Sequence, residues 1–153
     1  MGGGPAGAKR HFLGVHDMTD LIGSWALLSA TNYRDEDATP VYGDPPSGQI
    51  QYSADGRMSA FLMDPAWAAR GQPAADGFTE FFAYAGTWKR VENRVRHHVL
   101  FSSHPPRVGE VFERIVVVID ADRIELVTIP EVSKSGKTYV TRLMWQRIGG
   151  TKV

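Results

Sequence analysis

The sequence predicts an all-β fold, and two observations support this prediction. From Met18 onward, short apolar segments are separated by clusters of Gly, Pro, Asp and Asn, and few stretches are long enough for a helix. Several segments alternate apolar and polar residues, which is the period of a strand with one buried face. The segments amount to about eight strands with one or two short helices, and eight strands suffice to close a small barrel.

The clearest element is a hairpin over residues 48–63. In its first half, Ile50 and Tyr52 share one face and polar side chains occupy the other. An Ala-Asp-Gly sequence then predicts a tight turn, and Met58 begins the apolar face of the returning strand, 57–63. Tyr52 and Met58 are therefore expected to point into the interior.

Two further strands are expected over 82–89 and 94–101. In the second, alternation places His97 on the apolar side and His98 in solvent, or the reverse if the phase differs. The residues expected inside are Phe82, Tyr84, Gly86 and Trp88 from the first strand and Val95, His97, Val99 and Phe101 from the second. A glycine among them removes a side chain from the interior and favours a cavity.

The remaining strands are expected over 21–32, 111–119, 123–129 and 138–148. Residues 111–119 are apolar almost throughout, so the period does not assign their faces. Glu113 and Arg114 are neighbours on this strand, and only one of them can point inward.

One domain is expected over residues 18–149, after a Gly-rich leader over 1–17 and before a short tail over 150–153. Residues 64–77 hold Pro and Gly and predict a loop. A short helix over 74–82, capped by Asp76, is expected near the barrel mouth.

Composition excludes several functions. The 17 Lys and Arg balance the 17 Asp and Glu, so neither nucleic acid nor an anionic membrane surface is an expected partner. The absence of cysteine excludes disulfides, thiolate catalysis and Cys-ligated zinc. No apolar run reaches the roughly 18 residues of a membrane span, and no signal-peptide core is present. A cytoplasmic location is therefore expected.

Four stretches of the chain resemble the lipocalin-like domain proteins of bacteria and fungi, which belong with the true lipocalins in the calycin group. They are IGSWALLS at 22–29, GQIQYSADGRMSA at 48–60, YAGTW at 84–88 leading to VRHHV at 95–99, and LMWQR at 143–147. The resemblance implies an eight-stranded antiparallel up-and-down β-barrel with an internal pocket. It also implies a link to secondary metabolism, because the family has members in secondary-metabolite gene neighbourhoods.

The Gly23-x-Trp25 sequence is similar to the lipocalin entry motif, in which a tryptophan closes the barrel floor beneath an arginine of the last strand. Arg147 is the matching arginine, or Arg142 if the register differs. The resemblance implies a structural role for this pair, worth about 0.5 to 2 kcal/mol when a guanidinium covers an indole face.

Three residues are candidates for catalysis. An inward His97 can act as a general base, or it can be a buried histidine satisfied by a neighbouring hydroxyl or carbonyl. An inward Arg114 would hold a carboxylate, phenolate or enolate, whereas an inward Glu113 would form an acid-base couple with His97. The alternative for both charged residues is a surface ion pair.

A pocket in the barrel would bind a small hydrophobic or aromatic metabolite. Its expected lining residues are Tyr52, Met58, Tyr84, Trp88 and Phe101. No metal site is expected, because the neighbouring His97 and His98 point to opposite faces; the alternative is a site formed by His97, His104 and one carboxylate. No organic cofactor is expected either.

Three functions fit this sequence. The first is a cofactor-independent enzyme that dehydrates, isomerises or cyclises an apolar oxygenated metabolite by proton transfer. The second is a non-catalytic carrier of a small hydrophobic ligand, and the third is a solid barrel that acts through its rim. If 111–119 is exposed on one face, it would also supply a homodimer contact.

Overall fold

The structure is a computed structural model, and it describes residues 20–72 and 79–149. The predicted leader (1–17) and tail (150–153) lie outside the described residues. Among the described residues, no helix is long and apolar enough to cross a membrane.

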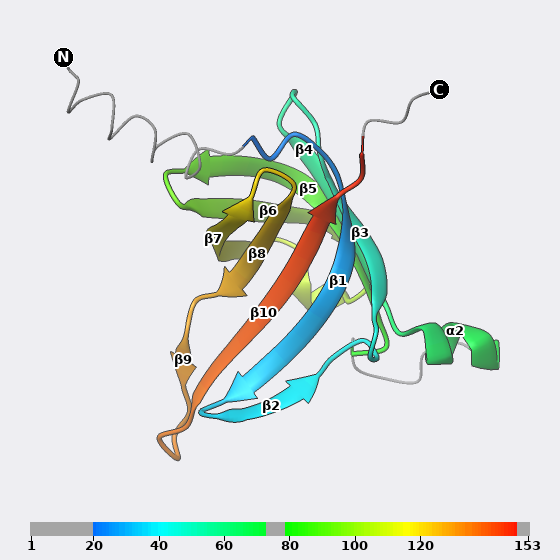
Figure 1. Cartoon of the computed structure of the whole chain (residues 1–153), viewed down its shortest axis with the longest axis vertical. Coiled ribbons are helices and arrows are strands. Elements are labelled where there is room, and N and C mark those ends of the chain that lie inside the picture. The colour runs from blue at the N-terminus through cyan, green and yellow to red at the C-terminus, as the bar shows by residue number, and fades with distance from the viewer. Residues whose placement is uncertain (1–19, 73–78, 150–153) are drawn as a thin grey trace.

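Eight strands form a closed antiparallel barrel (Figure 1). They are β1 (Gly23–Arg34), β3 (Ser47–Tyr52), β4 (Arg57–Met63), β5 (Phe81–Val91), β6 (Arg94–Ser102), β7 (Val111–Asp120), β8 (Arg123–Thr128) and β10 (Thr138–Arg147). Each strand pairs with the next, and pairing of β1 with β10 completes the ring. Two short strands, β2 (Asp37–Pro40) and β9 (Glu131–Val132), pair with the ends of β1 and β10. The predicted eight-stranded up-and-down barrel is confirmed.

The two ends of the barrel differ in their connections. Tight turns after β3, β5 and β7 lie at one end, because alternate connections of an up-and-down barrel share an end. The other end carries the long connections, which contain β2, α2 (Pro65–Arg70), the 3₁₀ helix η1 (Pro105–Arg107) and β9. This second end is therefore the mouth of the barrel.

The helix near the mouth is not where the sequence predicted it. Residues 65–70, expected as a loop, form α2, whereas Phe82 of the predicted helix belongs to β5. The Asp64 side chain caps α2 by accepting a hydrogen bond from the Ala66 amide at 2.9 Å. Pro65 fits the first helical turn because its missing N–H has no partner there in any helix. Residues 73–78, including the predicted cap, lie outside the described residues.

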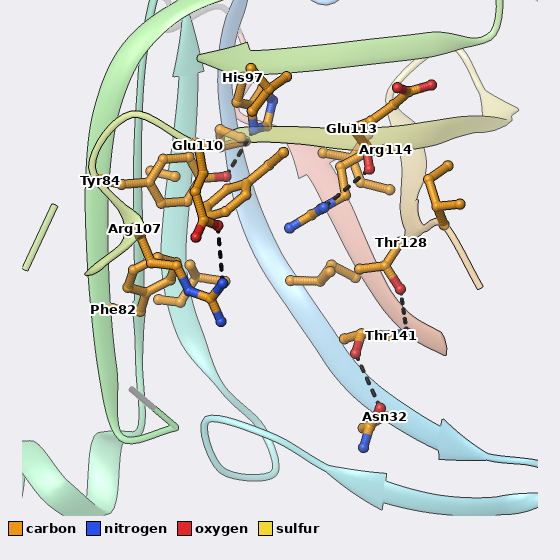
Figure 2. A pocket seen from close by; sticks show the side chains of 18 of the residues that line it. Asn32, Phe82, Tyr84, His97, Arg107, Glu110, Glu113, Arg114, Thr128 and Thr141 are labelled. Carbon is orange, nitrogen blue, oxygen red and sulfur yellow. Dashed lines mark hydrogen bonds and ion pairs between the residues drawn. The ribbon is translucent and has the colours of Figure 1, made fainter. Parts of the chain in front are cut away.

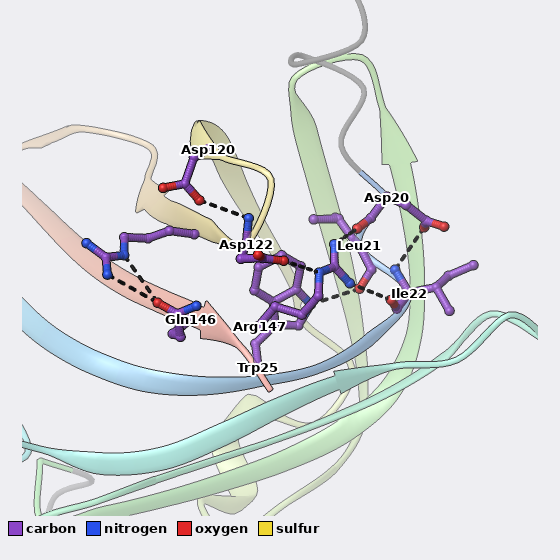
Figure 3. A network of polar contacts seen from close by, with 9 residues as sticks. Asp20, Leu21, Ile22, Trp25, Asp120, Asp122, Gln146 and Arg147 are labelled. Atoms are coloured by element: carbon purple, nitrogen blue, oxygen red, sulfur yellow. Dashed lines mark hydrogen bonds and ion pairs between the residues drawn. The ribbon is translucent and has the colours of Figure 1, made fainter. Parts of the chain in front are cut away.

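Trp25 and Arg147 close the end opposite the mouth (Figure 3). The strand register pairs the two residues, and the Arg147 guanidinium lies 4.3 Å from the centre of the fully buried indole ring. Arg147 also donates hydrogen bonds to the carbonyls of Asp20, at 2.7 Å, and Ile22, at 3.1 Å. The predicted contact is present with Arg147, whereas Arg142 forms an exposed ion pair with Glu125.

A β-bulge between β5 and β6 overturns one interior assignment. Ala85 pairs with Phe101 but Gly86 pairs with Val99, so Leu100 is an extra residue that reverses the alternation. Phe101 is therefore 66% exposed, and its predicted place inside the barrel is wrong. A Cβ on Gly86 would lie 1.8 Å from the His98 carbonyl oxygen. The glycine thus permits a close backbone approach at the bulge, and it is not a device that opens the interior.

We expect Arg147→Met to lower the free energy of unfolding by about 1 to 3 kcal/mol, because it removes the cation–π contact and both carbonyl hydrogen bonds. Urea denaturation monitored by circular dichroism measures the loss. Arg142→Met is the matched control on the same strand, and its exposed ion pair predicts a loss below about 1 kcal/mol. Equal losses in the two variants would contradict the structural role of Arg147.

Candidate functional site

The barrel encloses a cavity of about 640 Å³ that opens at the mouth. Its walls carry the apolar side chains of Ile50, Ala60, Leu62, Phe82, Phe112, Leu126 and Leu143. A cavity of this size and lining accommodates one small, largely apolar molecule. The interior is therefore not packed solid.

His97 lies at the wall of this cavity between two tyrosines. Its Nε2 is 2.6 Å from the Tyr52 hydroxyl, and its Nδ1 is 2.8 Å from the Tyr84 hydroxyl. The imidazole is only 1% exposed, which the alternation of β6 explains. The three side chains come from β3, β5 and β6, so the barrel joins groups that the sequence could place only one by one.

The groups of this cluster are neutral at neutral pH. Burial and then the positive charge of Arg114 lower the pKa of His97 to about 3. Burial raises the pKa of Tyr84 to about 12 and that of Tyr52 well above its ordinary value. His97 is accordingly an uncharged imidazole with one N–H and one free lone pair.

Figure 2 shows the Arg114 side chain pointing into the cavity and the Glu113 carboxylate pointing away from it. Glu113 forms ion pairs on the outer face with Arg94, at 2.7 Å, and Arg96, at 3.4 Å. The hydrogen bond from Arg94 is the main cause of the lowered pKa of Glu113. The alternative in which Glu113 couples with His97 is therefore wrong, because the strand period sends Glu113 to the opposite face.

Arg114 is half-buried at the cavity wall. Its guanidinium lies 5.1 Å from the centre of the Phe112 ring and donates to the Glu113 carbonyl at 3.1 Å. In the part of the chain that the structure describes, no carboxylate lies within 4.0 Å of it. The cavity wall thus carries a cation that forms no ion pair with a described acidic side chain.

Tyr42 is a cavity residue that the sequence analysis missed. It follows β2, is buried, and has a backbone φ of 63°, which is uncommon for a bulky side chain. Burial raises its pKa, as does Tyr84, while the charge of Arg114 opposes this rise. The only signal in the sequence is an aromatic residue inside a turn-rich segment.

Polar residues at the mouth were also missed. The Thr141 amide donates to the Thr128 hydroxyl at 2.8 Å, and the Thr141 hydroxyl donates to the Asn32 side chain at 3.2 Å (Figure 2). Across the mouth, Arg107 and Glu110 form an ion pair at 3.0 Å. The Thr141 contacts join strands that are distant in sequence, so no local pattern predicts them, whereas Arg107 and Glu110 are only three residues apart.

Of the five residues predicted to line the pocket, only Tyr84 does so. Tyr52, Met58 and Trp88 are inside the barrel but do not line the cavity. Tyr52 and Trp88 pack together with ring centres 4.8 Å apart, and the Trp88 indole donates to the Ser53 carbonyl at 3.0 Å. Tyr52 in turn packs against His97, with ring centres 5.5 Å apart. Phe101 lies outside, for the reason given above.

No group of three His, Asp or Glu side chains within residues 20–72 and 79–149 is arranged to hold a metal ion. His98, the alternative inward histidine, is exposed.

Comparison with known proteins shows that the model of a family described as lipocalin-like domain matches residues 22–148. No curated protein matches the chain. Among solved structures, the chain is similar to an uncharacterized protein from Bacteroides eggerthii at 13% identity and a TM-score of 0.42, over 80% of this chain and 98% of that one. A likeness at this level carries no functional argument.

The low pKa of His97 predicts a specific pH dependence of stability. In the unfolded chain His97 takes up a proton near pH 6.5, and in the folded chain only near pH 3. The free energy of unfolding is therefore highest above pH 6.5 and decreases as the pH falls toward 3, because protonation then favours the unfolded chain. Between pH 7 and 5 we expect the wild type to lose about 2 kcal/mol more than His97→Gln in urea denaturation.

His98→Gln is the matched control for this experiment, because it removes the exposed neighbouring imidazole. This variant should retain the wild-type loss between pH 7 and 5. If His97→Gln shows the same pH dependence as the wild type, His97 is not the responsible group.

Proposed function

Because the chain belongs to the lipocalin-like domain family, we propose that it binds one small, largely apolar molecule in the barrel and holds a negatively charged oxygen of that molecule at Arg114. The observation that carries the proposal is the half-buried Arg114 guanidinium at the cavity wall without a described carboxylate partner. A guanidinium removed from water is stabilised by an anion in hydrogen-bonding reach. The ligand is the missing partner.

The aromatic and aliphatic residues of the cavity wall indicate what kind of molecule carries this oxygen. Tyr84 lies against Phe112 at 5.0 Å in an edge-on arrangement and against Phe82 at 5.1 Å. These rings offer faces and edges to a planar ligand, and aliphatic side chains cover the opposite wall. A small aromatic or hydrophobic metabolite with one acidic or carbonyl oxygen fits this lining. That the ligand is a secondary metabolite is proposed from the family resemblance, and that the protein is cytoplasmic is proposed from its composition.

We expect the anionic probe 2-naphthoate to bind the wild type and Arg114→Gln to weaken its binding by about 10- to 100-fold in isothermal titration calorimetry. The neutral probe 2-acetonaphthone should lose less, because it carries no full charge. Arg96→Gln is the matched control, since it removes the same charge from the outer face of the neighbouring strand. Unchanged naphthoate affinity in Arg114→Gln would overturn the proposal.

A second candidate function is the cofactor-independent proton transfer predicted from the sequence. Its support is that Tyr84 and Arg114 both contact Phe112 at the cavity wall, with ring centres 5.0 Å apart for Tyr84 and the guanidinium 5.1 Å from the Phe112 ring centre. A ligand oxygen beside Phe112 could then accept from both groups. When a carbon beside a carbonyl loses its proton to water, the C–H electron pair forms a C=C bond and the carbonyl electrons move onto oxygen. Donors already aimed at that oxygen stabilise the resulting enolate, from which isomerisation or dehydration can proceed.

His97 would assist this reaction through Tyr84. Both of its ring nitrogens are engaged by tyrosines, so proton abstraction by His97 itself would require one of these hydrogen bonds to break. His97 is therefore best placed as a positioning residue for the Tyr84 hydroxyl.

The enzyme hypothesis predicts that the wild type accelerates hydrogen–deuterium exchange at the methyl group of 2-acetonaphthone in D₂O, measured by ¹H NMR. Tyr84→Phe and Arg114→Gln should each reduce the acceleration by about 10- to 100-fold. Tyr33→Phe, which changes a strand tyrosine outside the cavity, should not. If the protein binds 2-naphthoate but the methyl group exchanges no faster than in buffer, the enzyme hypothesis is rejected and the function as a carrier remains.

A further inference from the structure

We propose that Tyr52, acting through His97, orients the Tyr84 hydroxyl so that it donates its proton into the cavity. The site then selects ligands whose oxygen only accepts hydrogen bonds, such as a ketone, carboxylate or phenolate, over the corresponding alcohols. This inference rests on the proposed function and specifies the chemistry of the ligand oxygen.

The argument starts from the hydrogen-bonding capacity of a neutral imidazole, which has one N–H donor and one acceptor nitrogen. Tyr52 lies 2.6 Å from Nε2 and Tyr84 lies 2.8 Å from Nδ1. One tyrosine must therefore donate to the ring and the other must accept from it. Only two arrangements are possible.

In the first arrangement, Tyr84 donates to Nδ1 and the Nε2–H of His97 donates to Tyr52. The Tyr52 hydroxyl proton then has no acceptor, because His97 is the one side chain within hydrogen-bonding distance of Tyr52 in the described part of the chain. Tyr52 is 1% exposed, so water does not replace the missing acceptor. A buried hydroxyl without an acceptor is strongly unfavourable.

In the second arrangement, Tyr52 donates to Nε2 and the Nδ1–H of His97 donates to Tyr84. The one proton without a protein acceptor is then that of Tyr84, which lines the cavity where a ligand or solvent can accept it, so this arrangement is favoured over one that leaves the Tyr52 proton enclosed. The Tyr84 oxygen is occupied as an acceptor, and its own proton is free to point toward the cavity that Tyr84 lines.

The consequence concerns what Tyr84 and Arg114 offer a ligand. Arg114 has donors only, and in the favoured arrangement Tyr84 also presents a donor. A ketone or carboxylate oxygen beside Phe112, which both residues contact, can accept from both groups. A ligand hydroxyl can accept as well, but its own proton faces two donors and finds no acceptor in either group.

The tautomer is measurable without a ligand. Two-bond ¹H–¹⁵N correlations of the histidine side chains at pH 7 should show the Nδ1–H form for His97 in the wild type. In Tyr52→Phe, which keeps the ring and removes only the hydroxyl, the population should shift toward Nε2–H because Tyr84 can then donate to Nδ1. Tyr33→Phe should leave the tautomer unchanged. A wild-type His97 in the Nε2–H form would overturn the inference.

Ligand preference is the second measurement. The wild type should bind 2-acetonaphthone about tenfold more tightly than 1-(2-naphthyl)ethanol, which has the same skeleton and carries a hydroxyl in place of the carbonyl. In Tyr52→Phe this preference should fall to about twofold or less. An unchanged preference in that variant, or none in the wild type, would overturn the inference.

The two proposals fail in different ways. Absence of binding by 2-naphthoate and by both neutral probes would reject the proposed function. Intact naphthoate binding together with the wrong tautomer or no ketone preference would reject only the assignment of Tyr52 as the residue that orients Tyr84.

Discussion

Pairing between β1 and β10 closes the barrel, and the enclosed cavity depends on this pairing. An open sheet would expose two edges and would leave the inner faces of its strands in water. Trp25 and Arg147 stand opposite each other at one end of this closing pair. The pairing of β1 with β10 therefore both closes the barrel and brings together the two residues that cover its closed end.

Closure also creates the electrostatic conditions of the site. Inside the ring, the two nitrogens of His97 are hydrogen-bonded by Tyr84 of the neighbouring strand β5 and Tyr52 of the more distant β3, and burial keeps the imidazole neutral. Arg114 retains its charge at the cavity wall without a described acidic partner. A neutral cluster that leaves the Tyr84 hydroxyl as a donor, at the same cavity wall as a cation without an ion-pair partner, favours ligands that bring electron-rich oxygen.

Local alternation predicted much of the fold correctly. The hairpin of β3 and β4 and the inward face of β6 up to Val99 follow the two-residue period. The prediction failed at Phe101 because one extra residue in a bulge reverses the phase, and nothing in a single strand reveals its partner's register. The helix was misplaced because Asp64 and Pro65, which begin α2, also suit a loop.

The sequence by itself determined most of the strands and an inward His97, because strand period and turn residues are local properties. Its resemblance to the lipocalin-like domain proteins implied the up-and-down barrel and the pairing of Trp25 with an arginine of the last strand. Tertiary structure decided the rest. The largely apolar β7 has no clear period, so only its neighbours show that Arg114 faces inward while Glu113 meets the arginines of β6. Tyr42 joins the cavity through a loop, and the orientation of the Tyr84 hydroxyl depends on hydrogen bonds that exist only when three strands meet.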